Sequence, residues 1–202
     1  MRRIGLTGGI ACGKTTACGF FADLGVGIVS ADEVAHQIVQ PGHEAYLKIV
    51  EVFGEAILNE DRTINRLALG TLVFNSNDLR LKLNEITHPI IIRRTTEIME
   101  TMAQEHRYPF SIVDAALMVE SGSFERFEKL IVVWCTEAQQ IARIRARWGF
   151  SEQEARLRIG AQMPLSEKRK YADYEIDTSG TLEYTKEQVL RIYHSLLNKQ
   201  EQ

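Results

Sequence analysis

The chain has 202 residues, of which 45% are hydrophobic and 25% charged, and its formal net charge is -3 at pH 7. This length suits one compact α/β domain with a small inserted subdomain, and the composition is that of a globular protein with a substantial core. The mildly acidic balance excludes a global attraction to nucleic acid or to acidic membranes, and the strongest apolar run, Ile131–Cys135, is far shorter than the roughly 20 residues that span a bilayer.

Short apolar runs alternate along the chain with longer stretches of helical period. The expected strands are Arg3–Thr7, Gly27–Ser30, Phe110–Asp114, Leu130–Cys135 and Tyr174–Ile176. Such alternation is typical of parallel βαβ units rather than of hairpins. A last amphipathic helix, over Leu182–Leu197, is expected to pack on the sheet.

Two long segments lack strand signals. Between the second and third strands, from Glu33 to Tyr108, apolar residues recur at helical spacing, which predicts a helical insertion beside the sheet. The stretch from about 143 to 170 carries repeated arginines, namely Arg143, Arg145, Arg147, Arg156 and Arg158. By itself such a run of charge indicates a solvated helical face.

The clearest motif lies between the first strand and a helix that begins near Lys14. Residues 8–15 match G-x-x-x-x-G-K-[ST] at every fixed position. In this motif the backbone N–H groups of the loop and of the helix N-terminus point at phosphates, and glycine lets the backbone approach without a Cβ clash. The residues expected to contact ATP here are Gly8, Gly9, Ile10, Ala11, Cys12, Gly13, Lys14, Thr15 and Thr16.

Two side chains of this loop carry chemistry. Lys14 is expected to act in catalysis by reaching the β- and γ-phosphates, and the Thr15 hydroxyl is expected to ligate Mg²⁺. Strand, loop and helix in this order predict a P-loop NTPase-type α/β fold that binds ATP with magnesium. They leave open whether the terminal phosphate goes to water, to a small molecule or nowhere, because motors, switches and kinases share the loop.

Asp32 is the next residue of interest, because it directly follows the second expected strand. The carboxyl edge of an open α/β sheet is where ligands bind, so Asp32 is expected beside the phosphate loop, where a base for an acceptor hydroxyl is needed. An alternative interpretation is that Asp32 is the N-cap of the helix that starts near Glu33.

Together with the loop and the Asp32 segment, several later stretches resemble one family closely, the dephospho-coenzyme A kinases. The resemblance runs nearly from end to end of the chain. The matching pieces are Leu6–Ile10, Ala31–Ala35, Val39–Gly42, Ile86–Pro89, Leu117–Glu120, Arg143–Arg147, Ala161–Gln162 and Ala172–Asp177. The loop alone is generic, whereas this ordered set is specific.

The resemblance implies an ATP-dependent kinase that phosphorylates the ribose 3′-hydroxyl of dephospho-CoA. It also implies three parts: a nucleotide-binding core (1–32, 109–142 and 171–202), a helical substrate domain (33–108) and a helical lid (143–170). The implied partners are a small-molecule substrate, ATP and Mg²⁺, with neither nucleic acid nor membrane. The oligomeric state is left open.

The same resemblance implies roles for particular side chains. Asp32 resembles the catalytic carboxylate that faces the acceptor hydroxyl, and Arg143 resembles the lid arginine that meets the ATP phosphates, with Arg147 a second candidate. His88 matches a motif near the acceptor substrate, although a His before a Pro also suits a purely structural role. Glu120 matches an acidic position that binds substrate or a magnesium-bound water, and a carboxylate on a helix surface is its other interpretation.

Some positions depart from the family pattern. Ala116 stands where a proline is common, and Thr178 stands where an Asn is frequent, so details of the substrate and adenine contacts are in doubt. Cys12 occupies a loop position usually held by a small residue such as Ser. A thiol at a helix N-terminus is expected to have a lowered pKa, or else to be inert beneath bound phosphate.

The cysteines and the other histidines indicate no further site. Three cysteines, at positions 12, 18 and 135, are too few and too irregularly placed for a disulfide framework or a zinc site, which favours a reducing cytoplasm. His36, His43, His106 and His194 show no metal-ligand spacing and are expected to be surface or packing residues.

Two rival functions share parts of this pattern. Another small-molecule P-loop kinase, such as a nucleoside monophosphate kinase, would keep the core and lid, but the stretches around Asp32 and His88 argue against it. A regulatory nucleotide switch would need the guanine-reading Asn-Lys-x-Asp motif, which the chain lacks. The one Asp-x-x-Gly match, Asp177 to Gly180, falls far too late after the loop.

Overall fold

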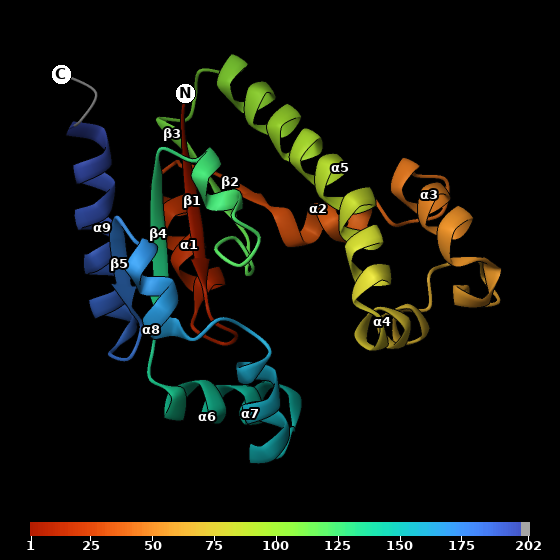
Figure 1. The fold of residues 1–202 in the computed structure, drawn as a ribbon. Helices are drawn as coiled ribbons and strands as arrows, with labels where there is room; N and C mark the ends of the chain where they lie inside the picture. The colour runs from red at the N-terminus through yellow and green to blue at the C-terminus, as the bar shows by residue number, and fades with distance from the viewer. Residues whose placement is uncertain (199–202) are drawn as a thin grey trace. The chain divides into compact units, whose positions relative to one another are not determined.

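The computed structural model describes residues 1–198, which form a five-stranded parallel sheet flanked by helices (Figure 1). The strands are β1 (Arg2–Gly8), β2 (Gly27–Ser30), β3 (Phe110–Asp114), β4 (Lys129–Trp134) and β5 (Tyr174–Asp177), in the spatial order β2-β3-β1-β4-β5. The predicted α/β fold with a parallel sheet is therefore confirmed. No helix among the described residues is long and apolar enough to cross a membrane.

The five predicted strands are all present, with small differences at their ends. β1 and β5 are each longer than predicted, and β4 is shifted one residue toward the N-terminus, so that Cys135 lies just beyond the strand. Strand ends depend on the neighbouring strand: β4 pairs with β1 from Lys129, opposite Ile4, and this register is invisible in the local hydrophobic pattern.

The helices fill the segments between the strands. They are α1 (Lys14–Asp23), α2 (Ala31–Gln37), α3 (Glu44–Phe53), α4 (Arg66–Asn75), α5 (Asn77–Gln104), α6 (Glu137–Trp148), α7 (Glu152–Gly160), α8 (Leu165–Lys168) and α9 (Leu182–Asn198), with short 3₁₀ turns at Glu55–Ile57, Ser123–Arg126 and Arg169–Tyr171. The arginine-rich segment is indeed helical. Capping boxes, Thr136 with Gln139 and Ser151 with Glu154, begin α6 and α7, because each satisfies N–H groups that the first turn leaves unpaired.

The chain divides into two compact units. We call Met1–Val29 together with the chain from Met99 onward the core unit, and Ser30–Ile98 the helical unit. The division falls within α5, which begins in the helical unit and ends in the core unit.

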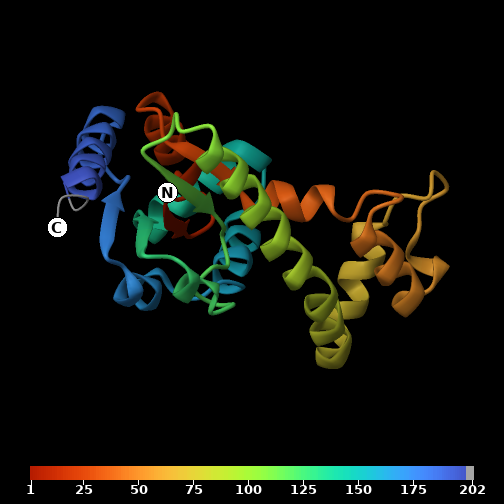
Figure 2. The same cartoon turned by 90° about the horizontal axis from the view of Figure 1, so that it is seen from above.

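One face of the sheet in the core unit is covered by the first and last helices. α1 and α9 pack against each other, and α9 also packs against β5 at the edge of the sheet (Figure 2). Their apolar side chains, among them Phe21, Val189 and Ile192, join Ile4 and Ile131 of the sheet in one buried cluster. Burial of such side chains is worth about 1.5–3 kcal/mol each, which holds the strands that carry the phosphate loop.

α6 and α7 pack together at the end of the sheet to which β4 leads (Figure 1). Their small core contains Ile141, Ile144 and Ala155, and the loop residues Ile10 and Ala11 pack against it. The helices α6 and α7 therefore share apolar contacts with the phosphate loop. The predicted lid boundary at residue 143 falls inside α6, which is one continuous helix from residue 137.

The helical unit has its own apolar clusters. Tyr46, Ile49 and Ile57 form one of them with residues of α4 and α5, and a second centres on Val34 and Ile90. The expected helical insertion is present here, and its only β-type pairing among the described residues is an isolated bridge between residues 58 and 64.

Candidate active site

The phosphate loop leaves β1 at Gly8 and enters α1 at Lys14. A Cβ on Gly8 would lie 2.3 Å from the Val133 carbonyl oxygen of β4, so only glycine fits this close approach of two backbones. Gly13, the N-cap of α1, has φ 82, a left-handed conformation that glycine adopts without strain. The positions that the motif reserves for glycine are thus required by the path of the backbone.

The turn of the loop is held by the side chains of Gln140, on α6, and Gln162, which follows α7. The Ile10 N–H donates to the side-chain oxygen of Gln162 at 2.7 Å, and the Gln140 amide donates to the Ile10 carbonyl oxygen at 2.8 Å. Ala11 has φ 58, which is uncommon for a residue with a Cβ and costs conformational energy. The two glutamine contacts therefore help to hold the loop in a conformation that its sequence alone does not favour.

Lys14 forms an ion pair with a residue that the sequence analysis did not single out. Its Nζ lies 2.9 Å from Asp114 Oδ1, and the two side chains are only 14% and 12% exposed. Asp114 ends β3, which pairs directly with β1, so both residues emerge at the carboxyl edge of the sheet. Asp114 could have been identified from the sequence, because the apolar run of the expected strand Phe110–Asp114 ends in this carboxylate.

The same pair fits the charges of a magnesium nucleotide. The ion pair with Lys14 is the contact that the structure gives Asp114 Oδ1, and no hydrogen bond from residues 1–198 reaches this buried oxygen. A carboxylate oxygen is the kind of donor that Mg²⁺ prefers. The residue types at this edge therefore fit a bound Mg²⁺, with lysine available for phosphate.

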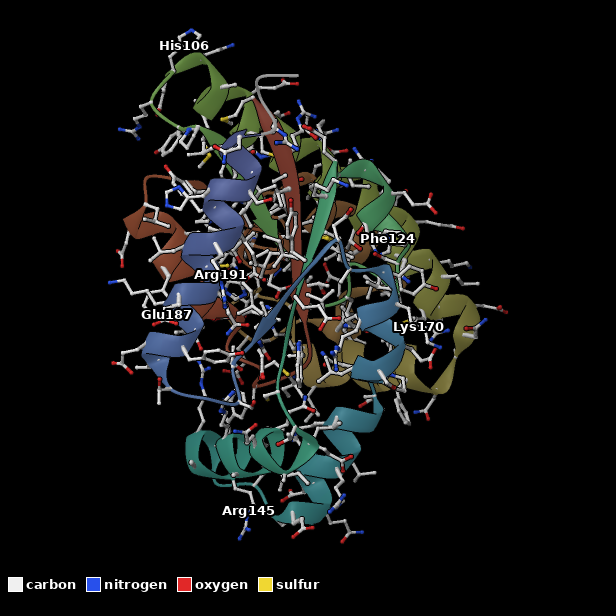
Figure 3. The ribbon with its side chains drawn as sticks, turned by 90° about the vertical axis from the view of Figure 1, so that its left-hand side faces the viewer. His106, Phe124, Arg145, Lys170, Glu187 and Arg191 are labelled. Atoms are coloured by element: carbon white, nitrogen blue, oxygen red, sulfur yellow. The ribbon has the colours of Figure 1, made fainter. Side chains whose placement is uncertain are left out.

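Arg143 extends from α6 to the loop and to the segment after β5. Its guanidinium donates to the Ala11 carbonyl oxygen at 3.3 Å, to the Thr178 hydroxyl at 3.1 Å and to the Thr178 carbonyl oxygen at 2.6 Å. Arg147, one turn later, is exposed and lies over the Trp148 ring. Figure 3 shows Arg145 on α6 pointing away from the sheet. The structure thus brings Arg143, but not Arg145, to the loop.

Glu120 joins the segment after β3 to residues that follow α7. Its Oε1 lies 2.9 Å from Lys168 Nζ and accepts from the Met163 N–H at 3.1 Å. Lys168 is fully buried and also donates to the Ala116 carbonyl oxygen at 2.9 Å. Glu120 lies in a turn region and not on a helix surface, so that interpretation is wrong; binding of substrate by Glu120 stays a prediction.

The helical unit contains a cavity of about 360 Å³ with a mixed lining. Its polar lining residues are Asp32, His36, Arg66, Asn84 and Thr87, and its apolar ones include Ile49, Leu69 and Val73. The Arg66 guanidinium is hydrogen-bonded to His36 Nδ1, and His36 is exposed, as expected of a surface residue. Cationic and apolar groups in one cavity suit an acceptor with phosphate and organic parts.

Asp32 lies in the first turn of α2, and the N-cap of that helix is Ser30. The Ser30 hydroxyl accepts from the Glu33 N–H at 3.2 Å, so the interpretation of Asp32 as the N-cap is wrong. His88 is exposed on α5, and its neighbours Asn84 and Thr87, not His88 itself, line the cavity. His88 is therefore not among the described residues that line this cavity, and its role in binding the acceptor stays a prediction.

The environment of Cys12 differs from the sequence expectation. A hydrogen bond with Cys135 and burial raise the pKa of the Cys12 thiol far above its ordinary value, so the expected lowering is wrong for Cys12. The hydrogen bond with Cys12, supported by the positive charge of Arg143, instead lowers the pKa of the Cys135 thiol. The contact between the two cysteines, and not the helix N-terminus, therefore determines which thiol has the lower pKa.

A family model, a curated relative and a solved structure carry the same description. A family model described as Dephospho-CoA kinase matches residues 2–184. A Dephospho-CoA kinase of Carboxydothermus hydrogenoformans is 42% identical over 189 residues, which cover 94% of this chain and 91% of the relative. Among solved structures, a Dephospho-CoA kinase from Campylobacter jejuni is 28% identical with a TM-score of 0.71, covering 99% of this chain and 100% of that one. The structure of TT1252 from Thermus thermophilus has a TM-score of 0.85 at 26% identity, covering 97% of each chain.

Proposed function

From the premise that this chain belongs to the dephospho-CoA kinase family, we propose how its residues divide the work of the reaction. The chain is a transferase that moves the terminal phosphate of ATP to the ribose 3′-hydroxyl of dephospho-CoA and releases CoA and ADP. The observation that carries the catalytic proposal is the contact between Lys14 and Asp114 at the mouth of the phosphate loop.

The core unit binds ATP. The loop residues Gly8 to Thr16 surround the phosphates with backbone N–H groups, Lys14 reaches the β- and γ-phosphates, and the Thr15 hydroxyl and Asp114 hold Mg²⁺. Bound magnesium supplies positive charge that neutralises the phosphate oxygens. The buried ion pair supports this assignment, because its two charges match the phosphate and the metal.

The helical unit binds the acceptor. Asp32 orients the acceptor hydroxyl for in-line attack and accepts its proton, while Arg66 offers positive charge to the diphosphate part of dephospho-CoA. The shared cavity lining of Asp32 and Arg66 supports this assignment. His88 is a weaker candidate for acceptor contact, because it is exposed beside that lining.

The lid completes the site. Arg143, with Arg147 in a secondary role, stabilises negative charge on the transferring phosphoryl group, and the segment 143–170 excludes water when it closes over ATP. Glu120 anchors this segment through Lys168 and orders water or substrate near the metal. The contacts of Arg143 with Ala11 and Thr178 support a position close to the nucleotide.

We further propose the three-part division into core (1–32, 109–142 and 171–202), substrate domain (33–108) and lid (143–170), and a place in the cytoplasm. The two compact units support the separate substrate domain, although their boundary falls at residues 29 and 98 rather than 32 and 108. Three free cysteines among the described residues suit a reducing compartment.

The function is tested by supplying the purified protein with ATP, Mg²⁺ and a panel of acceptors while ADP release is measured. We expect dephospho-CoA to be phosphorylated far faster than AMP or shikimate, and phosphorus NMR of the product to show a new 3′-phosphate. A faster reaction with either of the other acceptors would overturn the assignment.

A further inference from the structure

Two buried cysteines meet beneath the phosphate loop. Cys12 belongs to the loop and Cys135 directly follows β4, and their Sγ atoms lie 3.6 Å apart. The residues are only 1% and 3% exposed, and neither is in a disulfide. The third cysteine, Cys18 on α1, is also buried, and the structure gives it no such thiol partner among residues 1–198.

The backbones on both sides of this thiol pair are held by one hydroxyl. Thr178 Oγ1 donates to the Cys12 carbonyl oxygen at 2.8 Å and to the carbonyl oxygen of Trp134, the residue before Cys135, at 3.2 Å. Arg143 in turn donates to this hydroxyl. These hydrogen bonds hold the backbone at Cys12 and next to Cys135. The two sulfurs are therefore kept near each other by the backbone as well as by their side-chain conformations.

We propose that Cys12 and Cys135 are a site of reversible oxidation, at which a hydroperoxide converts the two thiols into a disulfide that distorts the phosphate loop. The Cys135 thiolate attacks one peroxide oxygen, and the O–O bond breaks to give a sulfenic acid and, after protonation, water or an alcohol. The Cys12 sulfur then displaces the sulfenic oxygen as a second water, and the S–S bond forms. The peroxide gains the two electrons that the two thiols lose.

The environment of Cys135 supports its role as the first nucleophile. Its hydrogen bond with Cys12 lowers the pKa of its thiol, and the positive charge of Arg143 acts in the same direction. Burial raises the pKa of Cys18 to about 12, so that this thiol stays protonated. Cys18 is consequently a matched internal control for a buried cysteine without a partner.

A disulfide at this site would alter nucleotide binding. Because the S–S bond is about 2.05 Å long, sulfurs that now lie 3.6 Å apart must approach each other. Cys12 is tied to the turn of the loop, since its N–H donates to the Gly9 carbonyl oxygen at 3.2 Å. Pulling Cys12 toward β4 therefore shifts the amides proposed to bind phosphate. Loss of one charge-assisted hydrogen bond makes ATP binding about tenfold weaker.

The test treats the full chain with hydrogen peroxide in the absence of nucleotide and reads its intact mass without reductant. We expect a loss of about 2 Da, which dithiothreitol reverses. Trypsin places the three cysteines on separate peptides, 4–14, 15–48 and 130–143, and the disulfide should join the first to the third. Cys18→Ala should still form it, and Cys135→Ala should not.

A second measurement separates this proposal from the proposed function. ATP affinity, measured by calorimetry, should fall about tenfold in the oxidised protein and return with dithiothreitol. Absence of the joined peptide in wild type, or a link that involves Cys18, would overturn the oxidation site whatever the kinase activity. A correctly linked protein with unchanged ATP affinity would overturn the effect on the loop.

Discussion

Lys14 Nζ and Asp114 Oδ1 are 2.9 Å apart, in a contact that joins the phosphate loop to the end of the neighbouring strand β3. Both side chains are largely shielded from water, so their charges interact more strongly than a surface pair would. The contact places a carboxylate beside the lysine that is proposed to reach the phosphates. It is the basis of our first prediction.

Asp114→Asn should lower kcat by about 10²-fold or more, and the Mg²⁺ concentration needed for half-maximal activity should rise. An amide of the same size keeps the packing but has lost the negative charge that attracts the metal. Steady-state rates across a Mg²⁺ titration measure both effects. Asp23→Asn, which changes an exposed carboxylate at the end of α1, is the matched control and should behave like wild type. An unchanged Mg²⁺ dependence would remove Asp114 from the metal site.

Asp32→Asn should reduce kcat by about 10²- to 10⁴-fold, because the amide cannot accept the proton of the acceptor hydroxyl. The melting temperature should change little, since Ser30 and not Asp32 caps α2. The neighbouring Glu33→Gln makes the same chemical change in the same helical turn and should keep near-normal turnover. If Asp32→Asn turns over within about threefold of wild type, its catalytic role is wrong.

Arg143→Ala should lower kcat/KM for ATP by about ten- to a hundredfold, the range expected for losing hydrogen bonds to a charged group. Arg143→Lys should recover only part of the lost kcat/KM, because a lysine ammonium cannot replace the planar guanidinium that contacts both Ala11 and Thr178. Arg145→Ala, which removes an outward-pointing arginine of the same helix (Figure 3), is the control. Equal kinetics for Arg143→Ala and Arg145→Ala would contradict the assignment.

Lys168→Met should destabilise the protein by about 3 kcal/mol, because it leaves the Glu120 carboxylate without its buried partner. Adding Glu120→Leu should restore part of that loss, although the Met163 N–H then lacks its acceptor. Urea unfolding of the two single variants and the double variant gives the coupling energy, expected to be about 1 kcal/mol or more. Lys170→Met breaks only an exposed pair with Glu167 and should change stability by less than about 0.5 kcal/mol. Strictly additive losses would show that the two charges do not cooperate.

Much of the fold could be predicted because its signals are local. The apolar runs of β2 and β3 are bounded by residues that end strands, and both were predicted with their observed limits. The backbone geometry of the phosphate loop requires glycine at Gly8 and Gly13. This requirement appears in the sequence as a motif of neighbouring residues. The helical insertion was visible from its period, since apolar residues must face its small cores.

Other parts of the site depend on partners far away in the sequence. The sequence around Asp114 predicts only the end of a strand. The pairing of β3 with β1 is what brings Asp114 to Lys14. Lys168 looks like one more charge in a polar segment, yet it is fully buried against Glu120. Of the two alternatives for Cys12, a thiol with a lowered pKa and an inert thiol beneath phosphate, the first is wrong, because a hydrogen bond with Cys135 raises the pKa of Cys12.

The sequence by itself determined the α/β class, the ATP loop with Lys14 and Thr15, and, through its ordered motifs, the family of the chain. These features depend on residues that are close together in the sequence, because the local backbone conformation and residue spacing determine them. The tertiary structure alone decided which charge faces Lys14, what Arg143 holds and which sulfur Cys12 touches. Such contacts join residues separated by up to 132 positions, and they arise from strand order and chain path, which no local pattern records.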